Sequence, residues 1–161
     1  MKTLIVYYTL EGNVAYLAET LGNQLQGRCY FLEPAKAYPK KGLIKYLFGG
    51  KDAVFGKGEA LKNPLPNLDG YDLILVGTPV WASRPAPPVQ TFLEKADLKG
   101  KAVGFFASHK GGGADKCFAR MKEKLDETVK YLGDIEFQNA KDGDRELIEQ
   151  HLANWIENLE I

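Results

Sequence analysis

The sequence predicts one α/β domain built on a doubly wound, five-stranded parallel sheet with strand order 2-1-3-4-5. Short apolar runs alternate along the chain with segments whose apolar residues recur every three or four positions. This is the pattern of buried strands alternating with amphipathic helices. The length of 161 residues suits a single domain with a full core. In this order the carboxyl ends of the first and third strands flank the point at which ligands bind.

The first strand and helix set the register of the chain. Residues 4–8 (LIVYY) form an unbroken apolar run, which predicts a central strand buried on both faces. Apolar residues then recur at helical spacing from Val14 to Leu25, so a helix is expected to pack back on the sheet. The N–H groups of its first turn have no intrahelical partner, and the helix dipole favours an anion there.

The turn between them is the candidate phosphate site. It consists of Thr9, Leu10, Glu11, Gly12, Asn13 and Val14. The Thr9 hydroxyl and the backbone N–H groups would donate to the phosphate, and Gly12 would let the backbone approach closely. The alternative is an ordinary strand-to-helix turn in which Asn13 serves as the N-cap.

The remaining elements follow in alternation. Further strands are expected at 28–33, 72–78, 101–107 and 134–138, the last with an irregular lead-in from 128; helices are expected from 87, around 117–125 and over 144–159. Residues 39–68 are rich in glycine, proline and lysine and form an elaborated connection within the domain 1–161. Only a short amphipathic helix around 43–48 is expected in it.

Two more turns fall at carboxyl ends of strands and should therefore meet the first. In residues 77–84, Trp81 lies in a proline-containing loop, where core packing explains it poorly and stacking on a planar ring suits it. The alternative is a Trp81 packed on its own loop, and Arg84 either pairs with an anion or is solvated. Residues 108–113 offer backbone groups free of side chains at Gly111, Gly112 and Gly113, or simply a flexible entry to the next helix. His109 there is expected at the surface rather than as an acid–base group.

Composition excludes several classes of protein. Lys plus Arg and Asp plus Glu both number 21, and a net charge of zero argues against nucleic acid as a partner. No apolar run has membrane-spanning length, and we expect no signal peptide and a cytoplasmic protein. Cys29 and Cys117 lack metal-ligand spacing and are expected to be small core residues. There is no Walker P-loop, no receiver-type acidic pair, no Ser-His-Asp arrangement and no metal-ligand cluster.

Three motifs resemble the flavodoxin-like proteins: TLEGN after the first strand, GTPVWASRPAPP after the third and SHKGGGADK after the fourth. The resemblance is closest to a short-chain group whose second loop reads TPVW-x-x-x-x-APP, and it covers the whole chain. It implies non-covalent binding of FMN and passage of electrons singly or in pairs. Residues 9–14 would hold the ribityl phosphate. The flavin ring would lie along Thr78, Pro79, Val80, Trp81, Ala82 and Ser83, with Trp81 stacked on it, and Ser108 and Gly111–Gly113 would border its pyrimidine end.

The chain departs from this family in two places. Glu11 and Val14 occupy positions where the family usually has hydroxyl residues, which leaves Thr9. A carboxylate about 4 Å from a phosphate charge costs up to roughly 4 kcal/mol at an effective dielectric near 20, so we expect Glu11 to turn outward. Many relatives have glycine after the stacking aromatic residue, whereas this chain has Ala82. Its methyl group disfavours positive φ by about 1 kcal/mol, and we expect the one-electron-reduced flavin to be poorly stabilised.

These observations favour an FMN-binding electron-transfer protein that exchanges electrons with redox proteins or a small-molecule acceptor. The alternative is an NAD(P)H-dependent FMN oxidoreductase with a quinone or similar acceptor, in which residues 39–68 form a cap or substrate wall. A flavin-binding sensor module is a third hypothesis. General electron carriers of this family are usually strongly acidic, whereas this chain has no net charge. The sequence does not decide whether the protein is a monomer or a homodimer. No catalytic residue and no metal ligand is assigned.

Overall fold

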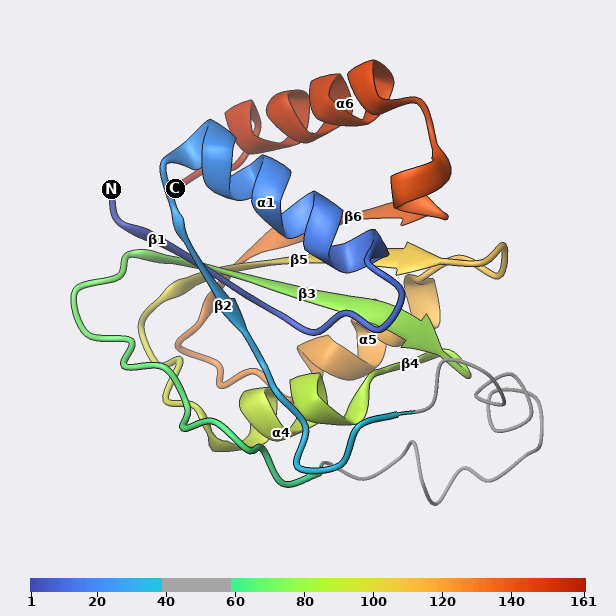
Figure 1. Cartoon of the computed structure of the whole chain (residues 1–161). Helices are drawn as coiled ribbons and strands as arrows, with labels where there is room; N and C mark the ends of the chain where they lie inside the picture. The colour runs from blue at the N-terminus through green and yellow to red at the C-terminus, as the bar shows by residue number, and fades with distance from the viewer. Residues whose placement is uncertain (39–58) are drawn as a thin grey trace.

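The computed structural model describes residues 1–38 and 59–161, in which a central sheet is covered by helices on both faces (Figure 1). The strands are β1 (Thr3–Tyr7), β2 (Arg28–Phe31), β3 (Leu73–Trp81), β4 (Arg84–Pro85), β5 (Ala102–His109) and β6 (Lys130–Gln138). The helices are α1 (Asn13–Leu25), α4 (Pro87–Lys95), α5 (Asp115–Lys122), the 3-10 helix η1 (Ala140–Asp142) and α6 (Arg145–Glu157).

The sheet has the predicted topology. Its strands are ordered β2-β1-β3-β5-β6, and every neighbouring pair in this path is parallel. Since β5 and β6 are the fourth and fifth strands of the sequence prediction, the order 2-1-3-4-5 is confirmed. The short strand β4 is an addition, and it pairs antiparallel with the end of β3.

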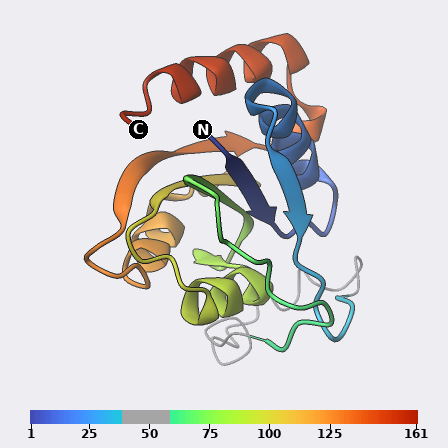
Figure 2. The same ribbon diagram turned by 90° about the vertical axis from the view of Figure 1, so that its left-hand side faces the viewer.

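Two apolar layers sandwich the sheet. α1 and α6 cover one face, and α4 and α5 cover the other (Figures 1 and 2). Successive residues of β1 alternate between the layers: Leu4 and Val6 belong to the cluster with α4 and α5, and Ile5 belongs to the cluster with α1. This alternation follows from the period of two residues in a strand, and burial on both faces explains the unbroken apolar run.

The carboxyl ends of the parallel strands lie together at one edge of the sheet, on the right in Figure 1. The start of α1, the β3–β4 hairpin, the turn after β5 and η1 all lie at this edge. The convergence of the three turns is therefore confirmed by the topology.

Several expectations about element bounds were wrong. β3 continues to Trp81, so residues 79–81 lie in the strand beyond its predicted end at Thr78, because they pair with β5 and β4. β6 begins at Lys130 rather than near residue 134, since its irregular lead-in pairs with β5 across a register shift. The helix expected around residues 43–48 lies outside the described residues.

The cysteines differ from each other. Cys117 is buried in the core, as expected, and burial raises the pKa of its thiol to about 12. Cys29 is exposed, so its assignment to the core was wrong: it lies on β2, where the sheet ends, and its thiol donates to the Ala18 carbonyl at 3.3 Å. In residues 1–38 and 59–161 no helix combines the length and hydropathy needed to span a bilayer.

Candidate functional site

The turn after β1 has a defined shape set by its own residues. Gly12 N donates to Thr9 Oγ1 at 3.1 Å, and Gly12 adopts a φ of 96°, a conformation that favours glycine. Helix α1 then begins at Asn13, and in the part of the chain that the structure describes no side chain caps its first turn. Donors of the first turn are thus left to other partners, as an anion site requires.

Asn13 does not cap α1, so the alternative of an ordinary turn capped by this residue was wrong. Gly12 occupies the N-cap position, and Asn13 is the first helical residue. The Asn13 side chain instead accepts a hydrogen bond from the backbone N–H of Lys141 in η1, with 2.9 Å between Lys141 N and Asn13 Oδ1. This bond ties the turn to the end of β6.

Glu11 points toward the turn after β5. Its Oε1 lies 2.8 Å from Lys110 Nζ, and about a third of its side chain is exposed. The ion pair joins the first and third turns across 99 residues of sequence. We expected Glu11 to turn outward because its carboxylate would repel a phosphate. The structure also places the Lys110 ammonium group beside this carboxylate, which offsets part of that repulsion.

The second turn is a tight hairpin between β3 and β4. Trp81 pairs with Arg84, and the two residues between them, Ala82 and Ser83, have φ values of 49° and 61°. Two consecutive left-handed residues are the geometry of a type I′ turn, which matches the twist of the flanking strands. The expectation that Ala82 would avoid positive φ was therefore wrong, because the hairpin imposes that conformation. Arg120 of α5 donates to the Ser83 carbonyl at 2.5 Å and holds the turn in place.

Thr78 and Trp81 are both buried. The Thr78 hydroxyl donates to the Pro79 carbonyl and accepts from Ala86 N at 2.9 Å. It therefore joins β3 to the residue that precedes α4. Trp81 is only 4% exposed and belongs to the core on the α4 side. The interpretation that core packing explains Trp81 poorly was wrong. Pro79 and Val80, between these two residues, are partly buried.

An aromatic cluster of Tyr8, Tyr38 and Trp81 links the first two turns. The Trp81 ring makes edge contacts with Tyr8, at 5.6 Å between centroids, and with Tyr38, at 5.2 Å. Burial raises the pKa of both tyrosine hydroxyls, and a hydrogen bond to the Glu59 carboxylate adds to this at Tyr38. Both tyrosines are therefore neutral at physiological pH. Since Tyr8 immediately precedes Thr9, Trp81 lies next to the phosphate candidate, as the fold predicted.

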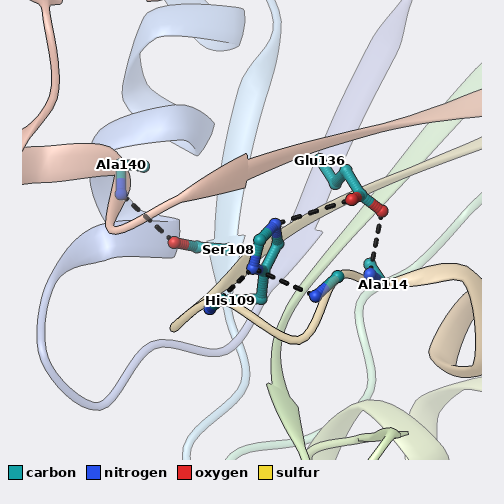
Figure 3. Close-up of polar contacts among 7 residues, drawn as sticks. Ser108, His109, Ala114, Glu136 and Ala140 are labelled. Atoms are coloured by element: carbon teal, nitrogen blue, oxygen red, sulfur yellow. Dashed lines mark hydrogen bonds and ion pairs between the residues drawn. The ribbon is translucent and has the colours of Figure 1, made fainter.

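The third turn is built around His109 (Figure 3). Its Nδ1 accepts from Gly111 N at 3.0 Å and from Gly113 N at 3.3 Å, and its Nε2 lies 3.5 Å from a carboxylate oxygen of Glu136. The other oxygen of Glu136 accepts from Ala114 N at 2.8 Å. The side chain of His109 is 12% exposed, so its expected surface position was wrong.

This network makes His109 part of the scaffold of the turn. With two backbone donors on Nδ1, the neutral ring carries its proton on Nε2, where it faces Glu136. Gly111 and Gly113 have φ values of 132° and 76°, and their N–H groups point inward to the ring. Hydrogen bonds thus fix the turn, which the sequence left open as a flexible entry to α5.

We expect His109→Leu to destabilise the protein by about 1–3 kcal/mol, because two backbone donors lose their acceptor. His109→Asn should recover part of this loss, since its Oδ1 can take the place of Nδ1. Urea unfolding gives the free energies, and hydrogen exchange at the Gly111 and Gly113 amides locates the effect. Equal stability and equal amide protection in both variants and the parent would contradict this role.

A fourth segment, η1, completes the edge, and the sequence did not indicate it. Ala140 N donates to Ser108 Oγ at 3.3 Å (Figure 3). Asn139 N donates to the His109 carbonyl at 2.9 Å. Lys141 Nζ donates to the Glu11 carbonyl at 2.6 Å. Lys110 and Lys141 thus both reach the first turn. No motif could have found them, because surface lysines are common and these contacts join distant parts of the chain.

The groups that gather at this edge are backbone and lysine donors. Among the described residues no three His, Cys, Asp or Glu side chains gather as they would around a metal ion. Among the residues that the structure describes, the partners of the His109 ring are the Gly111 and Gly113 amides and the Glu136 carboxylate. What converges at this edge is an uncapped helix start, two lysines and a glycine turn of fixed shape.

Comparison with solved structures finds several proteins with a similar fold. The structure is similar to a presumed flavoprotein from Bacteroides eggerthii, with a TM-score of 0.83, 24% identity, and coverage of 99% of this chain and 98% of that one. It is also similar to a flavoprotein in complex with FMN from Lactobacillus acidophilus, with a TM-score of 0.71, 22% identity, and coverage of 84% and 92%. Oxidised flavodoxin 2 from Bacillus cereus matches with a TM-score of 0.64, 17% identity, and coverage of 99% and 97%.

At these identities the solved structures establish the fold alone. The sequence itself matches the family model for flavodoxin over residues 2–159, nearly the whole chain. The chain therefore belongs to the flavodoxin family.

Proposed function

We propose that this protein binds FMN non-covalently and carries electrons between redox partners. The observation that carries the proposal is the joining of three turns at one sheet edge around an uncapped helix start. Membership of the flavodoxin family and the FMN complex of the Lactobacillus acidophilus relative support the choice of cofactor. When bound, FMN would accept electrons and pass them on singly or in pairs.

The residues at this edge fit such a cofactor. Residues 9–14 would hold its phosphate, since Gly12 shapes the turn at a φ of 96° and, among the described residues, no side chain caps the start of α1. Residues 78–83 and 108–113 would border the flavin. Of these, Ala82 is exposed at the tip of the hairpin, and the backbone of the glycine turn is free of side chains at Gly111–Gly113. The buried Trp81 packs against Tyr8, which precedes residues 9–14, and against Tyr38.

Anaerobic mixing with NADPH separates the carrier from the oxidoreductase. A carrier holding oxidised FMN should keep its yellow absorption band when NADPH is added alone and should lose it on addition of dithionite. Rapid bleaching by NADPH would contradict the carrier and support the NAD(P)H-dependent FMN oxidoreductase. Binding of FMN without electron exchange with any reductase would leave the sensor module.

Glu11→Thr is expected to tighten FMN binding, because it removes a carboxylate from the phosphate turn and adds a hydroxyl donor. Lys110 already offsets part of the repulsion from 2.8 Å, so the gain should not exceed about tenfold in Kd. Quenching of flavin fluorescence on titration gives the Kd. As a matched variant, Lys110→Met leaves Glu11 unpaired and should weaken binding. Unchanged or weaker binding by Glu11→Thr would show that this carboxylate does not penalise the phosphate.

A further inference from the structure

We propose that the ammonium group of Lys141 is a direct ligand of the FMN phosphate and supplies its counter-charge. This inference rests on the proposed function and adds a residue to that site, from a segment that no motif in the sequence indicated.

The backbone of Lys141 is fixed against two of the three turns. Lys141 N donates to Asn13 Oδ1 at 2.9 Å, and the preceding residue, Ala140, donates to Ser108 Oγ at 3.3 Å. Ala140 is 1% exposed and packs in the core with α1 and α6. η1 is therefore docked on the first and third turns, and the Lys141 side chain starts from a fixed point.

The side chain runs over the glycine of the phosphate turn. A Cβ added to Gly12 would lie 3.7 Å from Lys141 Cδ and 4.0 Å from Lys141 Nζ. The Nζ atom donates to the Glu11 carbonyl at 2.6 Å, which holds it beside the start of α1. An ammonium group has three donors, so one bond to Glu11 leaves two for an anion at the same turn.

The charge of Lys141 is not balanced by an ion pair among the described residues. The Glu11 carboxylate is taken by Lys110, and among the residues that the structure describes no carboxylate lies within 4 Å of Lys141 Nζ. Lys141 thus carries a charge without an ion pair among those residues, and the positive end of the α1 dipole adds to its field. The excess of positive charge favours a phosphate.

This arrangement also accounts for the departures of the turn from the usual family pattern. Glu11 and Val14 stand where hydroxyl groups would donate to the phosphate, and Val14 is buried in the core with only 1% exposure. A charged donor makes a stronger hydrogen bond to phosphate than a neutral hydroxyl, so Lys141 can take the place of these missing donors.

The test compares FMN with riboflavin, which has the same ring and chain but no phosphate. Lys141→Met should weaken FMN binding about 10- to 100-fold and leave the Kd of riboflavin within about twofold. Lys141→Arg should recover most of the FMN affinity. Lys130→Met, at the opposite edge of the sheet, removes the same charge and should leave both constants unchanged. The affinity of the parent for FMN should fall with salt more steeply than that of Lys141→Met.

The outcomes distinguish failure of the role of Lys141 from failure of FMN binding itself. Equal weakening of FMN and riboflavin by Lys141→Met would assign Lys141 a structural role through Glu11 and overturn the inference alone. Unchanged FMN binding would do the same. Failure of the parent protein to bind FMN at all would overturn the proposed function, and the phosphate ligand with it.

Discussion

Gly77→Ala should destabilise the protein by about 3 kcal/mol, near the upper end of the usual cost of overpacking a core. Gly77 lies on β3 directly opposite Phe106 on β5. A Cβ at this position would lie 2.2 Å from two atoms of the Phe106 ring, far inside van der Waals contact. Phe106 is fully buried, so its ring cannot swing into solvent to make room.

Urea unfolding of the purified variants measures this effect. Gly112→Ala is the matched control, because a Cβ there meets nothing within 4 Å, and its stability should stay within about 0.5 kcal/mol of the parent. Phe106→Leu in the Gly77→Ala background should recover part of the loss, so the double variant loses less than the sum of the two single changes. A Gly77→Ala protein as stable as the parent would show that the Phe106 ring does not lie over this glycine.

Trp81→Ala is expected to cost about 3–5 kcal/mol even in the protein stripped of flavin. The Trp81 side chain is 4% exposed and packs against Tyr8 and Tyr38, so its removal leaves a large cavity between β3 and the first turn. Trp81→Phe should cost much less because it keeps an aromatic ring in the cluster. If the only role of Trp81 were to stack on a flavin, its replacement would leave the stability of the flavin-free protein unchanged.

The measurement is unfolding of the flavin-free protein by urea, monitored through tyrosine fluorescence and circular dichroism. FMN affinity is then determined for Trp81→Phe, which should fold. A flavin-free Trp81→Ala protein with the stability of the parent would contradict the core position of this residue. It would restore the role in flavin stacking that the sequence alone suggested.

The fold was predictable because its signals are local and repeated. Unbroken apolar runs such as residues 4–8 require burial on both faces, and helical periodicity follows each run. Parallel order and the handedness of crossovers then leave few topologies. The positions of the three turns at one edge follow from that order alone, and the structure confirms this.

The interior of the site was less predictable because its contacts join distant segments. The sequence predicts that the third strand ends at Thr78, three residues before Trp81. The burial of Trp81 depends on the continuation of β3 and on its pairing with β4, which the sequence did not indicate. His109 was expected at the surface because its acceptor role involves backbone N–H groups, which leave no trace in a sequence. Lys141 reaches Glu11 across 130 residues, a contact that no spacing rule describes.

Ala82 shows how tertiary context overrides local preference. A methyl group disfavours positive φ, yet the two-residue hairpin requires it at both Ala82 and Ser83. The cost is of the order of 1 kcal/mol per residue and is offset by the pairing of Trp81 with Arg84 and the bond from Arg120 to Ser83. Poor stabilisation of the one-electron-reduced flavin was derived from the opposite premise, and it no longer follows.

The central claim is that three turns at one sheet edge bind a phosphorylated flavin, and the flavin content of the purified protein tests it most directly. The protein, purified natively and reconstituted with excess flavin, should be yellow with one flavin per chain. Acid should release that flavin without proteolysis, and chromatography should identify it as FMN. A colourless protein that shows no change in the fluorescence of added FMN would contradict the account.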